Sequence, residues 1–146
     1  MAVTAKWYGV PIKNQFDGTA VVDYDTDTIK VALHTVSYVP AQDTDDFFND
    51  ATNEITGTGY TAGGVTLGSK TVTYDTATNE MRLDAGDAQW TASSFTARIA
   101  THYKSTGVST TSPLISYVDF GGDETVASGT FTITWDATGV AKITAS

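Results

Sequence analysis

The sequence predicts an all-β protein: an antiparallel β-sandwich with a jelly-roll-like arrangement and one short helix in a long loop. Threonine supplies 27 of the 146 residues, and threonine suits the pleated, half-buried surface of a sheet. Segments in which apolar and polar side chains alternate recur along the chain, with Gly, Asn and Asp between them. Leu, Glu, Lys and Arg, which favour helices, are scarce by comparison. Together these observations indicate roughly seven to nine short strands.

The first clear strand covers residues 28–38, where apolar side chains at every second position share one face. A hairpin is expected next, because residues 71–74 and 80–84 both alternate and the segment between them is rich in turn-forming residues. The following strand covers residues 95–104. Its alternation places five side chains on one face: Phe95, Ala97, Ile99, Thr101 and Tyr103.

The remaining strands follow the same pattern. Residues 114–120 form a strand that we expect to stop at the two glycines that follow it. Residues 130–135 form another, and residues 136–139 turn the chain into a last strand at 140–144.

Two segments break the strand pattern. Residues 42–53 carry four aspartates around Phe47 and Phe48, which predicts a helix of one to two turns, capped by Thr44, with the two phenylalanines docked on the sheet edge. Residues 56–64 are too rich in glycine for a regular strand and predict an irregular connection.

The domain organisation is simple, because a chain of this length suits one domain. Residues 1–18 differ in composition from the rest and form either an N-terminal arm or the first strand, and residues 19–146 form a single β-sandwich domain.

The composition excludes several classes of protein. Eight basic against 17 acidic residues give a formal net charge of −9, which repels phosphate backbones and argues against nucleic acid as a partner. The chain has no cysteine, so disulfides and thiolate metal sites are excluded. No apolar run approaches the length of a membrane span, and the first residues lack an apolar signal core, so we expect no membrane partner and no export signal.

A metal site is also unexpected. Asp23, Asp25 and Asp27 have the spacing with which a calcium loop begins. Thr28 stands where such a loop needs glycine, and His34 where it needs a bidentate glutamate. We therefore interpret this segment as a solvated acidic turn and predict no cofactor.

Catalysis has little support in the sequence. Only His34 and His102 could act as general bases near neutral pH, and both fall inside predicted strands. No serine-nucleophile or zinc-protease motif occurs. Carboxylate pairs for glycoside hydrolysis could be assembled from the many aspartates, but solvated acids are far commoner. We predict that the protein is not an enzyme.

The three tryptophans raise the question of aromatic binding sites. Trp135 alternates with apolar residues and is expected in the core, whereas Trp90 at the end of a short strand can be either core or surface. The segment around Trp7 combines aromatic rings with cations, which is typical of interface anchors. It supplies the candidate partner-binding residues Lys6, Trp7, Tyr8 and Lys13. Packing of these residues against their own domain is an equally open alternative.

Several strings resemble a family of small virion structural proteins of tailed bacteriophages. They are KWYG at 6–9, DTDTIKVAL at 25–33, NEITGTGYTAGGVTL at 53–67, KTVTYD at 70–75, PLISYVDFG at 113–121 and GTFTITWD at 129–136. The similarity covers nearly the whole chain, although none of these strings is a chemical motif. The resemblance implies a component of the phage particle.

From the resemblance and the acidic charge we expect a capsid decoration protein, of the cement or head-spike kind, on the outer head surface of the virion. It would be a homotrimer that binds the major capsid protein through the N-terminal arm and stabilises the assembled head. The alternative is a tail- or fibre-associated module that binds a host receptor glycan. A phage hydrolase is a third class, for which no carboxylate pair can be assigned.

Overall fold

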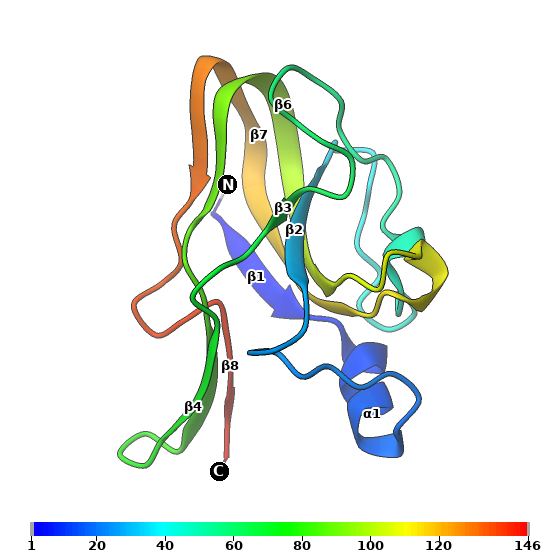
Figure 1. The fold of residues 1–146 in the computed structure, drawn as a ribbon, viewed down its shortest axis with the longest axis vertical. Helices are drawn as coiled ribbons and strands as arrows, with labels where there is room; N and C mark the ends of the chain where they lie inside the picture. The colour runs from blue at the N-terminus through cyan, green and yellow to red at the C-terminus, as the bar shows by residue number, and fades with distance from the viewer. Residues whose placement is uncertain (1, 146) are drawn as a thin grey trace.

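The computed structural model describes residues 2–145 and shows an all-β chain with two antiparallel sheets (Figure 1). The strands are β1 (Thr4–Trp7), β2 (Ile29–His34), β3 (Val65–Thr66), β4 (Thr71–Asp75), β5 (Glu80–Asp84), β6 (Ala88–Lys104), β7 (Leu114–Ile133) and β8 (Ala141–Thr144). The helical elements are α1 (Gly9–Asp17) and two short 3-10 turns, η1 (Phe48–Asp50) and η2 (Ser109–Thr111).

The larger sheet has five strands in the order β1-β7-β6-β2-β3, and the smaller has three in the order β4-β5-β8. The prediction of an all-β fold with antiparallel sheets is therefore confirmed, and the jelly-roll topology stays a prediction. The predicted hairpin is also confirmed: β4 and β5 pair from Thr71↔Asp84 to Asp75↔Glu80. A carboxylate oxygen of Asp75 accepts the backbone N–H of Ala77 at 2.9 Å, which shapes the turn.

Strands β6 and β7 form one long ribbon that bends over at the upper end of the molecule (Figure 1). The prediction that the strand at 114–120 stops at its following glycines is wrong, because β7 continues through them to Ile133. Gly121 has φ 79°, a conformation that glycine adopts without strain. Residues 120–123 form a bulge, since the pairing with β6 is interrupted between Asp119 and Glu124 and then resumes.

The single face predicted for residues 95–104 is wrong. The register is irregular between Ala97 and Ile99, because Ala97 pairs with Glu124 and Ile99 with Asp119, so that the extra residues of this bulge lie in β7. Phe95, Ala97 and Ala100 pack in one hydrophobic core, whereas Ile99 and Tyr103 pack in another.

The two cores lie on opposite faces of the five-stranded sheet. The first joins both sheets, since it contains Leu33 of β2 and Leu83 of β5. Trp90, with 2% of its surface exposed, belongs to this core, and Trp135 packs against it half-buried. The second core is covered by the loop after β2 and contains Tyr8 and Tyr38.

The helix predicted within residues 42–53 is wrong apart from the three residues of η1. The carboxylate of Asp50 accepts the backbone N–H of Asp46 at 3.0 Å, so these aspartates build a local turn. Phe48 does not dock on the sheet edge: its ring stacks on Tyr103, with centroids 4.0 Å apart, over the face of the sheet.

Helix α1 lies in the segment that the sequence offered as an arm or a first strand. Residues 4–7 do form an edge strand, which pairs with β7 from Thr4↔Asp119 to Trp7↔Ser116. The helix follows directly, with Pro11 in its first turn and Gly18 after its end at φ 77°. This order of proline and glycine is typical of a helix.

Candidate functional site

An apolar groove of about 610 Å³ lies between helix α1, residues 20–25 and the three-stranded sheet. These elements gather at the lower end of the molecule (Figure 1). Its apolar lining consists of Trp7, Ile12, Phe16, Val21, Val22, Tyr24, Val72, Met81, Leu83, Ile115 and Ile143.

The rim of the groove exposes large apolar side chains to solvent. Phe16 near the end of α1 has 88% of its surface exposed, and Val21 has 56%. Val72 of β4 and Ile143 of β8 face them from the small sheet and are also exposed. Isolated exposed apolar residues are ordinary, but several that converge on one groove make it the candidate binding surface.

Trp7 connects this groove to a second, more polar hollow of about 470 Å³. Its indole Nε1–H donates a hydrogen bond to the backbone oxygen of Lys142 at 2.9 Å, so the ring bridges β1 and β8. Lys6, Asp136 and Lys142 also line the second hollow. Trp7 is half-buried and is the side chain that the two hollows share.

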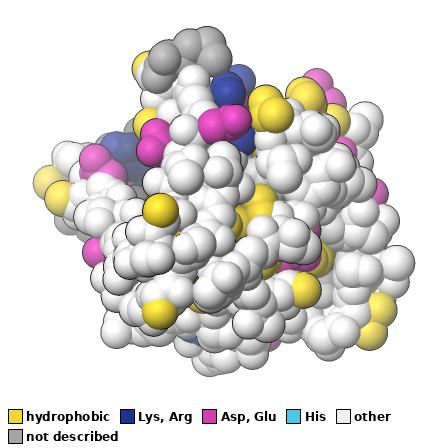
Figure 2. Space-filling model, turned by 90° about the horizontal axis from the view of Figure 1, so that it is seen from above, with side chains coloured by type: hydrophobic (Ala, Val, Ile, Leu, Met, Phe, Trp, Pro, Cys, Tyr) yellow, Lys and Arg dark blue, Asp and Glu magenta, His cyan; other side chains and the backbone are white. Residues whose placement is uncertain are grey.

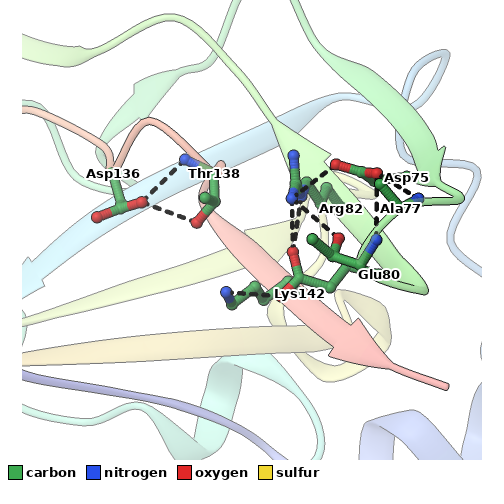
Figure 3. A network of polar contacts seen from close by, with 8 residues as sticks. Asp75, Ala77, Glu80, Arg82, Asp136, Thr138 and Lys142 are labelled. Carbon is green, nitrogen blue, oxygen red and sulfur yellow. Dashed lines mark hydrogen bonds and ion pairs between the residues drawn. The ribbon is translucent and has the colours of Figure 1, made fainter. Parts of the chain in front are cut away.

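The charged side chains beside the second hollow form an ion-paired network (Figure 3). Glu80 accepts hydrogen bonds from Lys142 Nζ at 2.9 Å and from Arg82 Nη2 at 2.6 Å. Arg82 also pairs with Asp75 at 3.0 Å. The hydrogen bonds from Lys142 and Arg82 lower the pKa of Glu80 to about 2. The network holds the outer ends of β4, β5 and β8 together.

The structure separates the four predicted partner-binding residues. Lys6 is exposed and lines the polar hollow, and Trp7 lines both hollows. Tyr8 is fully buried in the second core, where its hydroxyl lies 2.7 Å from that of Tyr38. Burial raises the pKa of Tyr8. Lys13 is exposed on α1 and pairs with Asp17.

The four residues therefore do not form an arm that docks on a partner as a unit. Tyr8 cannot reach a partner while the domain stays folded, because its ring belongs to the core. Phe16, Val21 and Ile143 were missed as candidates. The spacing of Ile12 and Phe16, four residues apart, was an available signal, since such residues share a face once the segment is a helix.

The two histidines lie in the cores and not in the groove. His34 Nδ1–H donates to the backbone oxygen of Thr52 at 2.9 Å, and its Nε2 lies 2.8 Å from the hydroxyl of Thr101. Burial lowers the pKa of His34 to about 4. His34 is therefore a neutral structural residue at pH 7.

His102 is held between two hydroxyl groups. Its Nε2 lies 3.1 Å from the hydroxyl of Tyr24, and its Nδ1 lies 3.1 Å from that of Ser116. Burial lowers the pKa of His102 to about 3. Both imidazoles thus use their two nitrogens in core hydrogen bonds.

The acidic segment 23–27 forms a closed turn. Asp27 pairs with Lys104 at 2.8 Å, and its carboxylate also accepts the backbone N–H of Asp23 at 2.8 Å. Across residues 2–145, no group of three or more His, Asp or Glu side chains is placed to hold a metal ion.

The surface seen in Figure 2 is mostly uncharged, with basic and acidic side chains close together at its upper left and apolar side chains scattered elsewhere. No helix in the described part of the chain is long and apolar enough to cross a membrane.

In comparisons with known proteins, no family model, no curated protein and no solved structure matches this chain. The resemblance to phage virion proteins therefore stays a prediction.

Proposed function

We propose that the protein is a bacteriophage virion structural protein that decorates the outer head surface and stabilises it. In this proposal the groove at Trp7 binds an apolar segment of the major capsid protein, and the protein acts as a cement without catalysing a reaction. The observation that carries the proposal is the exposed rim of the groove, above all Phe16 with 88% of its surface in contact with solvent.

The apolar character of the groove supports a macromolecular partner. Phe16, Val21, Val72 and Ile143 remain exposed around a floor that is already apolar. Burying apolar surface contributes about 25 cal/mol per Å², so covering such a patch of a few hundred Å² favours association by several kcal/mol before ordering costs.

The charge supports the outer surface of a head. A net charge of −9 repels packaged DNA. Two acidic side chains, Asp23 and Asp25, line the groove beside its apolar residues. Glu80 and Asp75, beside the polar hollow, pair with Lys142 and Arg82.

A protein that binds only the assembled head stabilises it by mass action. At a free concentration of 100 times the dissociation constant, each occupied site contributes about 2.7 kcal/mol.

The groove is tested by replacing its most exposed residue. Heads are purified without the protein, and wild type or variant is then added. Phe16→Ser should occupy these heads about tenfold less than the wild type, because it removes the main apolar contact from the rim. Val39→Ser is the matched control, since Val39 is 79% exposed and lies outside the groove lining. Both variants should unfold at the wild-type temperature. Normal occupancy of heads by Phe16→Ser would overturn the assignment of the groove.

The copy number of the chain in purified virions tests the location. A number near one per capsid subunit, or a simple fraction of it, supports decoration of the head lattice. A count of a few to a few tens would move the protein to the tail or a vertex. In that case glycan binding by a tail-associated module would become the better proposal.

A further inference from the structure

The small sheet has two outer strands, and the chain protects them unequally. On β8, the Trp7 indole occupies the backbone oxygen of Lys142. Strand β4 pairs only with β5, and no other backbone hydrogen bond within residues 2–145 involves residues 71–74. Alternate N–H and C=O groups of β4 therefore face outward without a partner.

Four of the five residues of β4 lack the usual protections of an edge strand, and its charged residue, Asp75, is ion-paired with Arg82. Residues 71–74 read Thr-Val-Thr-Tyr, with no proline, no lysine and no charge. All four are exposed. Natural sheets protect such edges with charge, proline or a bulge, because an open regular edge can pair with a strand of another chain.

We propose that β4 pairs with the β4 strand of a second copy of this chain, antiparallel and centred on Thr73. The two small sheets would then join into one sheet of six strands. This inference does not rest on the proposed function, since it concerns the free protein in solution.

The register follows from the self-complementary order of residues in β4. With Thr73 opposite Thr73 of the second copy, Val72 of each copy lies opposite Tyr74 of the other. Val72 and Tyr74 share the apolar face of the small sheet, and 45% and 55% of their surfaces are exposed. Pairs of an aromatic with a β-branched residue, and pairs of threonines, are favourable cross-strand neighbours.

The charged side chains of the small sheet permit a second copy to approach β4, although the whole chain is strongly acidic. By the strand alternation, Asp75, Glu80, Asp84, Arg82 and Lys142 lie on the polar face of the small sheet. Three acids and two bases give this face a net charge of −1, against −9 for the chain. Arg82 pairs with Asp75, the charged residue of β4, at 3.0 Å (Figure 3).

Only one pair of short strands would meet, so the contact is smaller than the roughly 1,200–2,000 Å² of stable complexes and should be weak. Sedimentation of the full chain from about 10 μM to about 1 mM covers the range of such affinities. The apparent mass should rise from 15.4 kDa towards twice that value. A mass that stays at one chain would overturn the proposal, as would a limit at three chains, because an edge paired with itself closes at two.

Charge variants at the centre of the contact test the register. Thr73→Lys and Thr73→Glu each place like charges opposite each other, so each alone should weaken the dimer by about tenfold or more. An equimolar mixture should recover dimers that contain one copy of each variant. Thr144→Lys, on the exposed outer strand β8, is the control for added charge and should dimerise like the wild type.

Two further results would contradict the β4 contact: undiminished dimers of Thr73→Lys, or a mixture that stays monomeric while both variants are folded by circular dichroism. These measurements use no capsid. Loss of the dimer is therefore distinguishable from loss of head binding by Phe16→Ser.

Discussion

The indole Nε1–H of Trp7 donates a hydrogen bond to the backbone oxygen of Lys142 at 2.9 Å, across 135 positions of sequence. This contact ties the first strand of the large sheet to the last strand of the small one. It also occupies a backbone acceptor on the outer side of β8 and forms the wall between the apolar groove and the polar hollow. One side chain thus determines the shape of the candidate site.

Trp7→Phe should lower the free energy of unfolding by about 1 kcal/mol, because it removes one hydrogen bond and keeps an aromatic ring in place. Urea unfolding followed by circular dichroism measures the change. Lys6→Ala is the neighbouring control and should stay within about 0.5 kcal/mol of the wild type, because Lys6 is exposed. An unchanged midpoint for Trp7→Phe would show that the bond to Lys142 contributes nothing to folding.

The buried histidines should make the fold sensitive to acid. In the unfolded chain each binds a proton below about pH 6.5, whereas burial lowers the folded pKa to about 4 for His34 and about 3 for His102. The stability that they contribute is therefore complete above pH 6.5 and decreases as the pH falls towards the folded pKa values. The slope should be up to about 1.4 kcal/mol per pH unit for each histidine.

Urea unfolding of the wild type and His34→Gln between about pH 7.5 and about pH 4.5 checks this linkage. The variant should be less stable at neutral pH, because glutamine fits the site less well, but its stability should fall less steeply with acid. Equal slopes for both proteins would contradict the assignment of this acid sensitivity to His34.

Gly64→Ala should destabilise the protein by about 3 kcal/mol or more. Gly64 has φ 73°, and a Cβ atom there would overlap the backbone oxygen of Val31 in β2. Gly68→Ala is the matched control, because a Cβ at Gly68 would meet no atom within 4 Å, and it should be neutral within about 0.5 kcal/mol. Thermal unfolding measures both, and equal melting temperatures would mean that the loop does not pack closely on β2.

The features predicted correctly from the sequence depend on near neighbours. The hairpin of β4 and β5 follows from alternation on both sides of a turn-rich segment, and the strand at Ile29–His34 follows from its own apolar pattern. The irregular path of residues 56–64 follows from its glycines, since a Cβ at Gly57 would lie 2.7 Å from the backbone oxygen of Ser94.

The errors concern features that depend on distant partners. The irregular register opposite Ala97 and Ile99 depends on β7, whose residues 120–123 form a bulge there. For Tyr8 the sequence left partner binding and packing against its own domain equally open, and the structure places its ring in a core with Tyr38 and Tyr117. In the candidate site, Lys6 and Trp7 were predicted, whereas Phe16 and Ile143 were not.

The sequence by itself determined the fold class, the hairpin, the acidic charge and the dominance of strands over helices. The charge and the dominance of strands follow from the composition of the whole chain. The hairpin follows from the alternation of apolar and polar residues within one short segment. Only the tertiary structure decided that α1 and the small sheet leave an apolar groove between them, and that β4 presents an open edge. Both features depend on where one sheet ends relative to another, which is set by long-range packing and register and not by the residues of any single segment.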